Sequence, residues 1–301
     1  LDEKAMGGTE LMKYALHDKL PAKLLTQFNI IPSRVRELAQ DKENILWLHD
    51  LPQDPESQHL KDGGWKKFKK LVYVSHWQKQ QYENFLGIPP STGVVMQNAI
   101  EPIPTHTKPD PAECVNIIYH RGLELLIPIL KHIREVMPDV KWHLDVYSSF
   151  GIYGWEQRDE PYQKLFQTIR DDEDMTYHGH VPNEEVKVAL QKAHIYAFPS
   201  IWPETSCISL LEAMSAGCIC VHSSLAALPE TAANWTFQYD FTEDMQEHAT
   251  RHAVTLMDAM RVLKDDNMQA RLNMQMSYTN GFYGWSVREQ QWKTFLTNLL
   301  V

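Results

Sequence analysis

Residues 195–224 read "IYAFPSIWPETSCISLLEAMSAGCICVHSS", and this stretch decides the fold. It opens with an apolar run typical of a buried strand and continues into a helix that Gly217 is placed to end. It closes with a second run of strand type, "CICVHSS" (residues 218–224). The stretch therefore predicts one β-α-β unit, the building block of a parallel sheet.

The same alternation of strand and helix extends upstream. We expect strands at residues 115–120, 141–149 and 175–181, and helices at residues 121–136, 160–171 and 183–194. The first hundred residues repeat the pattern more faintly, with a helix at 9–20, strands at 44–50, 70–77 and 93–100, and a helix that ends at Gly87. The fold class is therefore α/β, with two Rossmann-like domains built on parallel sheets.

A proline-rich segment separates the two halves. Four prolines fall within residues 102–111, which is typical of an extended linker between domains. We therefore expect an N-terminal domain over residues 1–103, a C-terminal domain over residues 104–280 and a terminal helix over residues 281–301.

Two places do not fit an uninterrupted pattern. A parallel domain should open with a strand, yet the sequence reaches Gly7 and Gly8 without one. The predicted strand that ends at His120 also abuts the predicted helix at Arg121, although such connections usually need at least two residues. We expect residues to be absent from this sequence before Leu1 and between His120 and Arg121. A loop at the second place would lie at the carboxyl end of a strand, where ligands bind in α/β sheets.

Composition limits the function. Hydrophobic residues at 43% and charged residues at 23% are typical of a soluble globular protein, and the formal net charge of −10 argues against a nucleic-acid partner. The basic run "WKKFKK" (residues 65–70) could contact a membrane surface peripherally, although such short runs are more often solvated. No apolar run is long enough to span a membrane, and the four cysteines form no CxxC pair. We expect a cytoplasmic protein with reduced thiols.

Two carboxylates stand out in the opening stretch. Glu204 precedes the predicted helix and Glu212 lies inside it among apolar residues, where an unpaired carboxylate is costly. With Thr205 or Ser206 as N-cap, the helix N-terminus would offer N–H groups to a phosphate. Glu212 could then accept hydrogen bonds from ribose hydroxyls, and Glu204 from a sugar. The alternative is that Glu204 stabilises the helix dipole and Glu212 lies on a solvated face.

The neighbouring residues favour the first interpretation. The segment "ETSCISLLE" followed by "AMSAGCICV" (residues 204–221) resembles the E-x(7)-E region of the retaining glycosyltransferases of family 4. That family has the GT-B architecture, two facing Rossmann-like domains with a cleft between them. Further segments resemble the family in chain order, namely "GGTE" (7–10), "VMQNAIE" (95–101), "RGLELLIPI" (121–129), "TYHGHVPNEEV" (176–186) and "GWSVREQQWKTFL" (284–296).

The resemblance implies roles for three glycines. Gly7 and Gly8 would let the main chain approach the donor phosphates and sugar, because no side chain intervenes. Gly179 would bring main-chain groups to the edge of the nucleotide base.

It also implies roles for charged and polar residues. Arg121 would hold the diphosphate and stabilise the charge of the leaving group, whereas "YH" or the suspected gap stands where the family has a companion basic residue just upstream. Glu204 would contact the transferred sugar and Glu212 the ribose. Thr205 and Ser206 would face the donor at the helix N-terminus.

His49 ends a predicted strand, where the family often places a histidine near the sugar, and Asp50 could orient it. The alternative is a histidine that caps the strand end through a main-chain hydrogen bond. His178 and His180 are spaced like a metal-binding pair, but no third ligand is evident, so we expect no metal site.

The sequence therefore predicts an enzyme that transfers a sugar from a nucleoside diphosphate donor to an acceptor hydroxyl with retention of configuration. The resemblance implies no metal ion and no cofactor besides the donor itself. The acceptor would be a glycan, a lipid-linked compound or another hydroxyl. Two alternatives stay open, a nucleotide-sugar epimerase and a non-catalytic protein of the same fold that binds sugar nucleotides or glycans.

Overall fold

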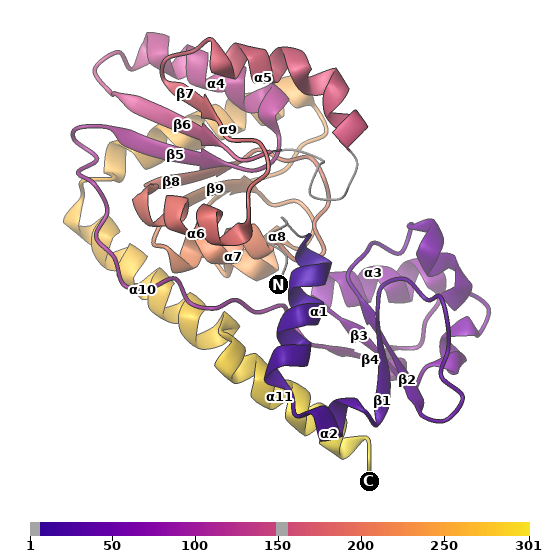
Figure 1. Ribbon diagram of the computed structural model, residues 1–301. Coiled ribbons are helices and arrows are strands. Elements are labelled where there is room, and N and C mark those ends of the chain that lie inside the picture. Colours follow the sequence, from indigo (N-terminus) through magenta and orange to yellow (C-terminus); the bar gives the residue numbers. More distant parts are fainter. Residues whose placement is uncertain (1–6, 149–155) are drawn as a thin grey trace. The chain divides into compact units, whose positions relative to one another are not determined.

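The structure is a computed structural model that describes residues 7–148 and 156–301 (Figure 1). The chain divides into two compact units. The larger unit contains residues 102–202 and 209–280 together with Gly7, and the smaller unit contains residues 8–101, 203–208 and 281–301. The short segment 203–208, which holds Glu204, Thr205 and Ser206, thus belongs to the smaller unit although the chain on either side of it belongs to the larger one.

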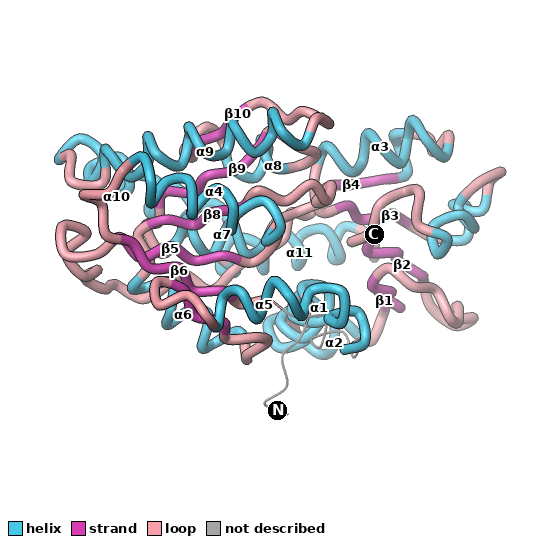
Figure 2. The backbone as a smooth tube through the Cα atoms, turned by 90° about the horizontal axis from the view of Figure 1, so that it is seen from above, coloured by secondary structure: helices cyan, strands magenta, loops and turns pink. Residues whose placement is uncertain are grey.

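The described part of the larger unit is built on a six-stranded sheet with the order β10-β9-β8-β5-β6-β7, and every neighbouring pair is parallel. Its strands are β5 (Val115–Tyr119), β6 (Trp142–Val146), β7 (Met175–Tyr177), β8 (Ile195–Phe198), β9 (Ile219–Ser223) and β10 (Phe237–Tyr239). Figure 2 shows β9, β8, β5 and β6 side by side in that order. The predicted parallel α/β fold is confirmed.

Helices cover both faces of this sheet (Figure 1). They are α4 (Leu123–Val136), α5 (Gln163–Arg170), α6 (Asn183–Lys192), α7 (Ile208–Ser215), α8 (Leu228–Ala232), α9 (Met245–Val262) and α10 (Asp266–Tyr283). One face of the strands packs on α4, α5 and α9, and this contact forms a single apolar core that includes Ile117, Leu144, Leu126, Phe166 and Leu256. Burial of that face fixes which side chains of β5 and β6 point away from it.

The described part of the smaller unit has a four-stranded parallel sheet with the order β1-β2-β3-β4. Its strands are β1 (Phe28–Pro32), β2 (Glu43–Leu48), β3 (Lys70–Tyr73) and β4 (Gly93–Val95). Its α-helices are α1 (Gly8–Lys19), α2 (Ala22–Leu25), α3 (His76–Leu86) and α11 (Trp285–Asn298), and its 3-10 helices are η1 (Pro55–Leu60), η2 (Gly64–Lys67) and η3 (Pro90–Thr92). Trp285 and Trp292 of α11 pack in one core with Met12 of α1 and Trp47 of β2.

Several expected bounds are corrected by the structure. Strand β5 ends at Tyr119 and α4 begins at Leu123, so residues 120–122 form the turn that the sequence pattern had left no room for. Helix α7 begins at Ile208, so neither Thr205 nor Ser206 is its N-cap. Strands β1 and β10 were not predicted.

The predicted end of α7 at Gly217 is confirmed. Gly217 follows the last turn of α7 with φ of +73°, and the N–H of Cys218 returns to the carbonyl of Ala213, as in a glycine-terminated helix. All four cysteines are reduced thiols. Among residues 7–148 and 156–301, no helix is long and apolar enough to cross a membrane.

Candidate functional site

The strand order of the larger sheet reverses between β5 and β8. The chain runs outward from β5 through β6 and β7 and then returns to place β8 against the other side of β5. In open parallel sheets, ligands bind outside the carboxyl ends of the strands at such a reversal. The two loops at this place are residues 120–122, after β5, and residues 199–202, after β8.

The two loops pack directly on each other at Gly122. Its φ is +92°, and a Cβ atom there would lie 2.8 Å from the main-chain carbon of Pro199 and 2.9 Å from the nitrogen of Ser200. Only glycine fits both the backbone angle and the space. The local sequence "RGL" thus allows the strand to turn into α4 within three residues.

The turn carries Arg121, the predicted diphosphate ligand, and His120. Arg121 is half-buried and lies at the carboxyl end of β5, where its planar guanidinium suits a phosphate. His120 has a buried Nε2 atom that accepts and donates no hydrogen bond within the described residues. Burial, together with the charge of Arg121, lowers the pKa of His120 to about 4, so its imidazole is neutral near pH 7.

Glu212 lies on α7 and is buried, with 4% of its surface exposed. The amide nitrogen of Asn183, at the start of α6, donates a hydrogen bond of 3.2 Å to Oε1 of Glu212. Burial raises the pKa of Glu212 to about 7, against the smaller opposing effects of this bond and of Lys187. The solvated-face alternative for Glu212 is therefore wrong.

Two small residues of α7 near Glu212 form hydrogen bonds within the protein. Ser209 shares a 2.7 Å hydrogen bond with the hydroxyl of Tyr196, and Ser215 donates a 2.6 Å bond to Asn280. Sequence reasoning missed Asn183, whose place directly after "GHVP" at a helix start was the available signal.

Gly179 lies in the loop after β7 with φ of +71°, a backbone angle that favours glycine. The preceding His178 is held by a 2.7 Å hydrogen bond between its Nε2 and Oδ1 of Asp145, and its ring stacks on Tyr147 with centroids 4.4 Å apart. The loop therefore starts from a fixed aromatic pair at the carboxyl ends of β6 and β7.

In the smaller unit, His49 directly follows β2. Its N–H donates a 3.1 Å hydrogen bond to Oγ of Ser33, and its carbonyl accepts a 2.6 Å bond from Oγ1 of Thr205. Its ring packs against Trp47, and its buried Nε2 has no partner within the described residues. Burial lowers the pKa of His49 to about 3, so the imidazole is neutral.

Asp50 does not orient the imidazole in the way the sequence suggested. Its carboxyl hydrogen-bonds Ser33, and its carbonyl accepts bonds from Gln78 at 2.9 Å and Tyr82 at 3.1 Å. Burial, reinforced by Asp54, raises the pKa of Asp50, and the bond to Ser33 opposes that rise. Asp50 is thus coupled to the main chain of His49 through Ser33.

The predicted site residues fall into two groups. Arg121, Gly179 and Glu212 lie in the larger unit, as does Gly7. Gly8, His49, Glu204, Thr205 and Ser206 lie in the smaller unit. Gly8 opens α1, and a Cβ atom there would lie 3.1 Å from Cδ1 of Ile208, so this glycine also allows α1 to approach the segment that follows Glu204.

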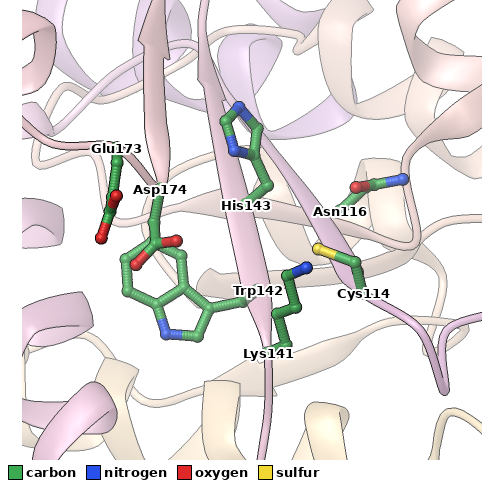
Figure 3. Close-up of a pocket in the computed structure, with 7 residues that line it drawn as sticks. All are labelled: Cys114, Asn116, Lys141, Trp142, His143, Glu173 and Asp174. Atoms are coloured by element: carbon green, nitrogen blue, oxygen red, sulfur yellow. The ribbon is translucent and has the colours of Figure 1, made fainter.

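A cavity of about 610 Å³ lies elsewhere, at the amino ends of β5, β6 and β7. Figure 3 shows its lining residues, namely Cys114, Asn116, Lys141, Trp142, His143, Glu173 and Asp174. The cavity lies at the amino ends of these strands, whereas the candidate site lies at the carboxyl ends of β5 and β8. The two are therefore separate. No group of three or more His, Cys, Asp or Glu side chains in residues 7–148 and 156–301 is arranged to hold a metal ion.

The two parallel α/β units have the GT-B fold, as solved structures show. A glycosyltransferase from Rickettsia africae ESF-5 aligns over 100% of this chain and 84% of its own, with a TM-score of 0.71 and 12% identity. The pneumococcal O-GlcNAc transferase GtfA, solved with UDP and GlcNAc, aligns over 96% of this chain and 60% of its own, with a TM-score of 0.64 and 12% identity.

The chain belongs to the family described as Glycosyl transferases group 1, which matches residues 115–273, more than half of the sequence. One component of the phosphatidylinositol N-acetylglucosaminyltransferase of Arabidopsis thaliana is 24% identical over 170 residues. That match covers 54% of this chain and 36% of the relative, so the chain spans about a third of the length of this curated protein.

Proposed function

We propose that this glycosyltransferase is a retaining enzyme of family 4 that moves a sugar from a nucleoside diphosphate donor to an acceptor hydroxyl. The observation that carries the proposal is Glu212. It is a buried carboxylate in the family-matched region, held by Asn183 next to the loop that follows β7. A buried carboxylate that only one neutral amide bonds, among the described residues, is destabilising unless a ligand supplies further hydrogen bonds.

The remaining predicted residues supply the other parts of the reaction. Arg121, at the carboxyl end of β5, would neutralise the departing diphosphate in place of a metal ion. Glu204, with the E-x(7)-E spacing to Glu212, would favour the positive charge that develops on the sugar. His49 would contact the sugar through its neutral imidazole. The diphosphate would leave and the acceptor hydroxyl would enter on the same face of the sugar, which gives retention without a covalent intermediate.

The names of the relatives suggest which donor to try first. GtfA was solved with UDP and GlcNAc, and the Arabidopsis relative is a component of an N-acetylglucosaminyltransferase. We propose a uridine diphosphate sugar as donor and a glycan, lipid-linked or other hydroxyl compound as acceptor. A peripheral membrane contact at residues 65–70 stays a prediction.

The test is UDP binding measured by calorimetry for the native chain and for Glu212→Ala. We expect the substitution to weaken binding by about 1.5–3 kcal/mol, the range for hydrogen bonds to a charged group. Glu184→Ala is the matched control, because Glu184 is an exposed carboxylate in the same unit whose partner is Lys187. Equal affinities of the native chain and Glu212→Ala for UDP would contradict the ribose role.

A second measurement separates an enzyme from a binding protein. The short turn at residues 120–122 provides one basic side chain, Arg121, which favours the binding alternative. Slow release of sugar from UDP-GlcNAc, followed by NMR, should give first the anomer of the donor. Absence of release from every uridine diphosphate sugar tried, with UDP still bound, would favour the binding protein.

A further inference from the structure

Both main-chain polar groups of His49 are held by hydroxyls from distant parts of the sequence. The Ser33 hydroxyl accepts from the His49 N–H, and the Thr205 hydroxyl donates to the His49 carbonyl over 2.6 Å, across 156 positions. Thr205 is 9% exposed, so water competes little for this bond. The peptide that carries the imidazole is therefore fixed from two sides.

The backbone at Ser33 supports the same interpretation. Its φ is +61°, a left-handed conformation that is unusual for serine and is retained where the surroundings enforce it. Ser33 is buried and also hydrogen-bonds the Asp50 carboxyl. Strained residues of this kind cluster at functional sites, where they aim a neighbouring group.

This peptide carries an imidazole with one nitrogen that no described residue bonds. Nε2 of His49 is buried and has no partner within the described residues, and Trp47 packs against the ring. A buried nitrogen in this state is destabilising unless a ligand bonds it.

We propose that Thr205 is a positioning residue that holds the main chain of both His49 and Glu204 in place. Thr205 directly follows Glu204 in the chain, so the bond that holds the His49 carbonyl also fixes the main chain that carries the Glu204 carboxylate. Thr205 acts through these two neighbours and does not bind the donor, in contrast to the role that the sequence predicts for it. This inference rests on the proposed transferase function.

The experiment compares Thr205→Val, which keeps the shape and removes the hydroxyl, with Thr205→Ser, which keeps the hydroxyl. We expect Thr205→Val to lower kcat by about 10- to 100-fold, the scale of a small misplacement of reacting groups. Its KM for the donor and Kd for UDP should stay within about twofold, because the nucleotide contact assigned to Glu212 lies in the larger unit. Thr205→Ser should recover most of kcat.

Thr92→Val is the matched control, since the Thr92 hydroxyl also donates to a main-chain carbonyl in the smaller unit, that of Pro89 at 2.7 Å. It lies just before β4, at the amino edge of the sheet, and should leave kcat unchanged. If Thr205→Val does not fold, Ser33→Gly removes the other hydroxyl at a backbone angle that glycine adopts readily. It should lower kcat in the same way.

A double-mutant cycle distinguishes positioning from general loosening of the unit. If Thr205 acts through Glu204, Thr205→Val should cost less than about threefold in kcat once Glu204→Gln is present, because coupled residues are not additive. Full additivity, or native kcat in Thr205→Val, would overturn the inference. Absence of transfer by the native chain would instead count against the proposed function, so the two failures are distinguishable.

Discussion

At the scale of single residues, Glu212 has the least ordinary environment of the proposed site residues. Its carboxylate is buried with one amide partner in the part of the chain that the structure describes, and its pKa is raised to about 7. A carboxyl whose pKa is higher in the folded than in the unfolded chain holds its proton more tightly when folded. Its contribution to the free energy of unfolding is therefore greatest at low pH and is lost as pH rises from about 4.5 to above 7.

We predict that Glu212→Gln removes this loss of stability at high pH. The variant should match the native chain in free energy of unfolding near pH 4.5 and exceed it at pH 8 by about 3 kcal/mol, the free energy that corresponds to a carboxyl pKa of about 7 in place of 4.5. Gln keeps an oxygen for the Asn183 amide to bond. Urea unfolding of both proteins at the two pH values measures the difference. A difference that does not change with pH would show that the pKa of the carboxyl is not raised in this way.

Glu212 also shows what can and cannot be predicted from the sequence at the scale of a residue. The spacing from Glu204 to Glu212 identified both carboxylates as candidates for chemistry. Whether Glu212 is solvated or buried depends on α6 packing beside α7, and nothing in the local sequence reports that contact. In the same way, "WLHD" placed His49 at a strand end, but its hydroxyl partners come from Ser33 and from Thr205, far along the chain.

At the scale of elements, the long periodic segments were predictable and the short ones were not. Residues 195–198 are a continuous apolar run, residues 115–119 are apolar except for Asn116, and both segments are strands. Strand β1 was missed because "FNIIP" ends in proline, which is rare inside a sheet, and only two of its five residues are buried. The start of α7 was placed too early because Thr205 and Ser206 are good caps, whereas the hydroxyl of Thr205 bonds His49 instead.

The turn between β5 and α4 supports a second prediction, on Gly122→Ala. The substitution adds left-handed backbone strain of about 1–2 kcal/mol and a Cβ atom 2.8 Å from the Pro199 main chain. We expect the substitution to lower the free energy of unfolding of the larger unit by more than the backbone strain alone would, because the Cβ atom also clashes. We also expect it to weaken UDP binding.

Gly87→Ala is the control for strain without a clash. Its φ is +66°, and nothing lies within 4 Å of the added Cβ atom. Thermal unfolding of the two variants should show a clearly smaller loss for Gly87→Ala. Equal losses would mean that the approach of residues 120–122 to Pro199 is looser than described.

At the scale of the whole molecule, the smaller unit is assembled from three separate pieces of sequence. Residues 8–101 supply its sheet, residues 203–208 add the segment with Glu204, and residues 281–301 add α11. Trp292 of α11 is 1% exposed and packs edge-on against Trp47 with ring centroids 5.1 Å apart. The terminal helix therefore completes the core behind the strand that leads to His49.

We predict that Trp292→Ala destabilises the smaller unit by about 3–5 kcal/mol, the usual cost of truncating a large buried aromatic side chain. Phe85→Ala is the control, because Phe85 is an aromatic residue of the same unit that is 50% exposed, and it should cost less than about 1 kcal/mol. Chemical unfolding followed by tryptophan fluorescence measures both. Similar losses in the two variants would show that α11 contributes little to this core.

The three-piece construction also has a consequence for synthesis on the ribosome. Trp47 and the rest of the first piece emerge about 180 residues before α11, roughly ten to forty seconds at ordinary rates of translation. During that interval the apolar surface that Trp285 and Trp292 will cover stays exposed on the nascent chain. The larger unit needs no residue of α11 in its core and can fold first. Nascent chains of this protein should therefore pass through a stage in which the larger unit is folded and residues 8–101 are not, and chaperones would bind residues 8–101 at that stage.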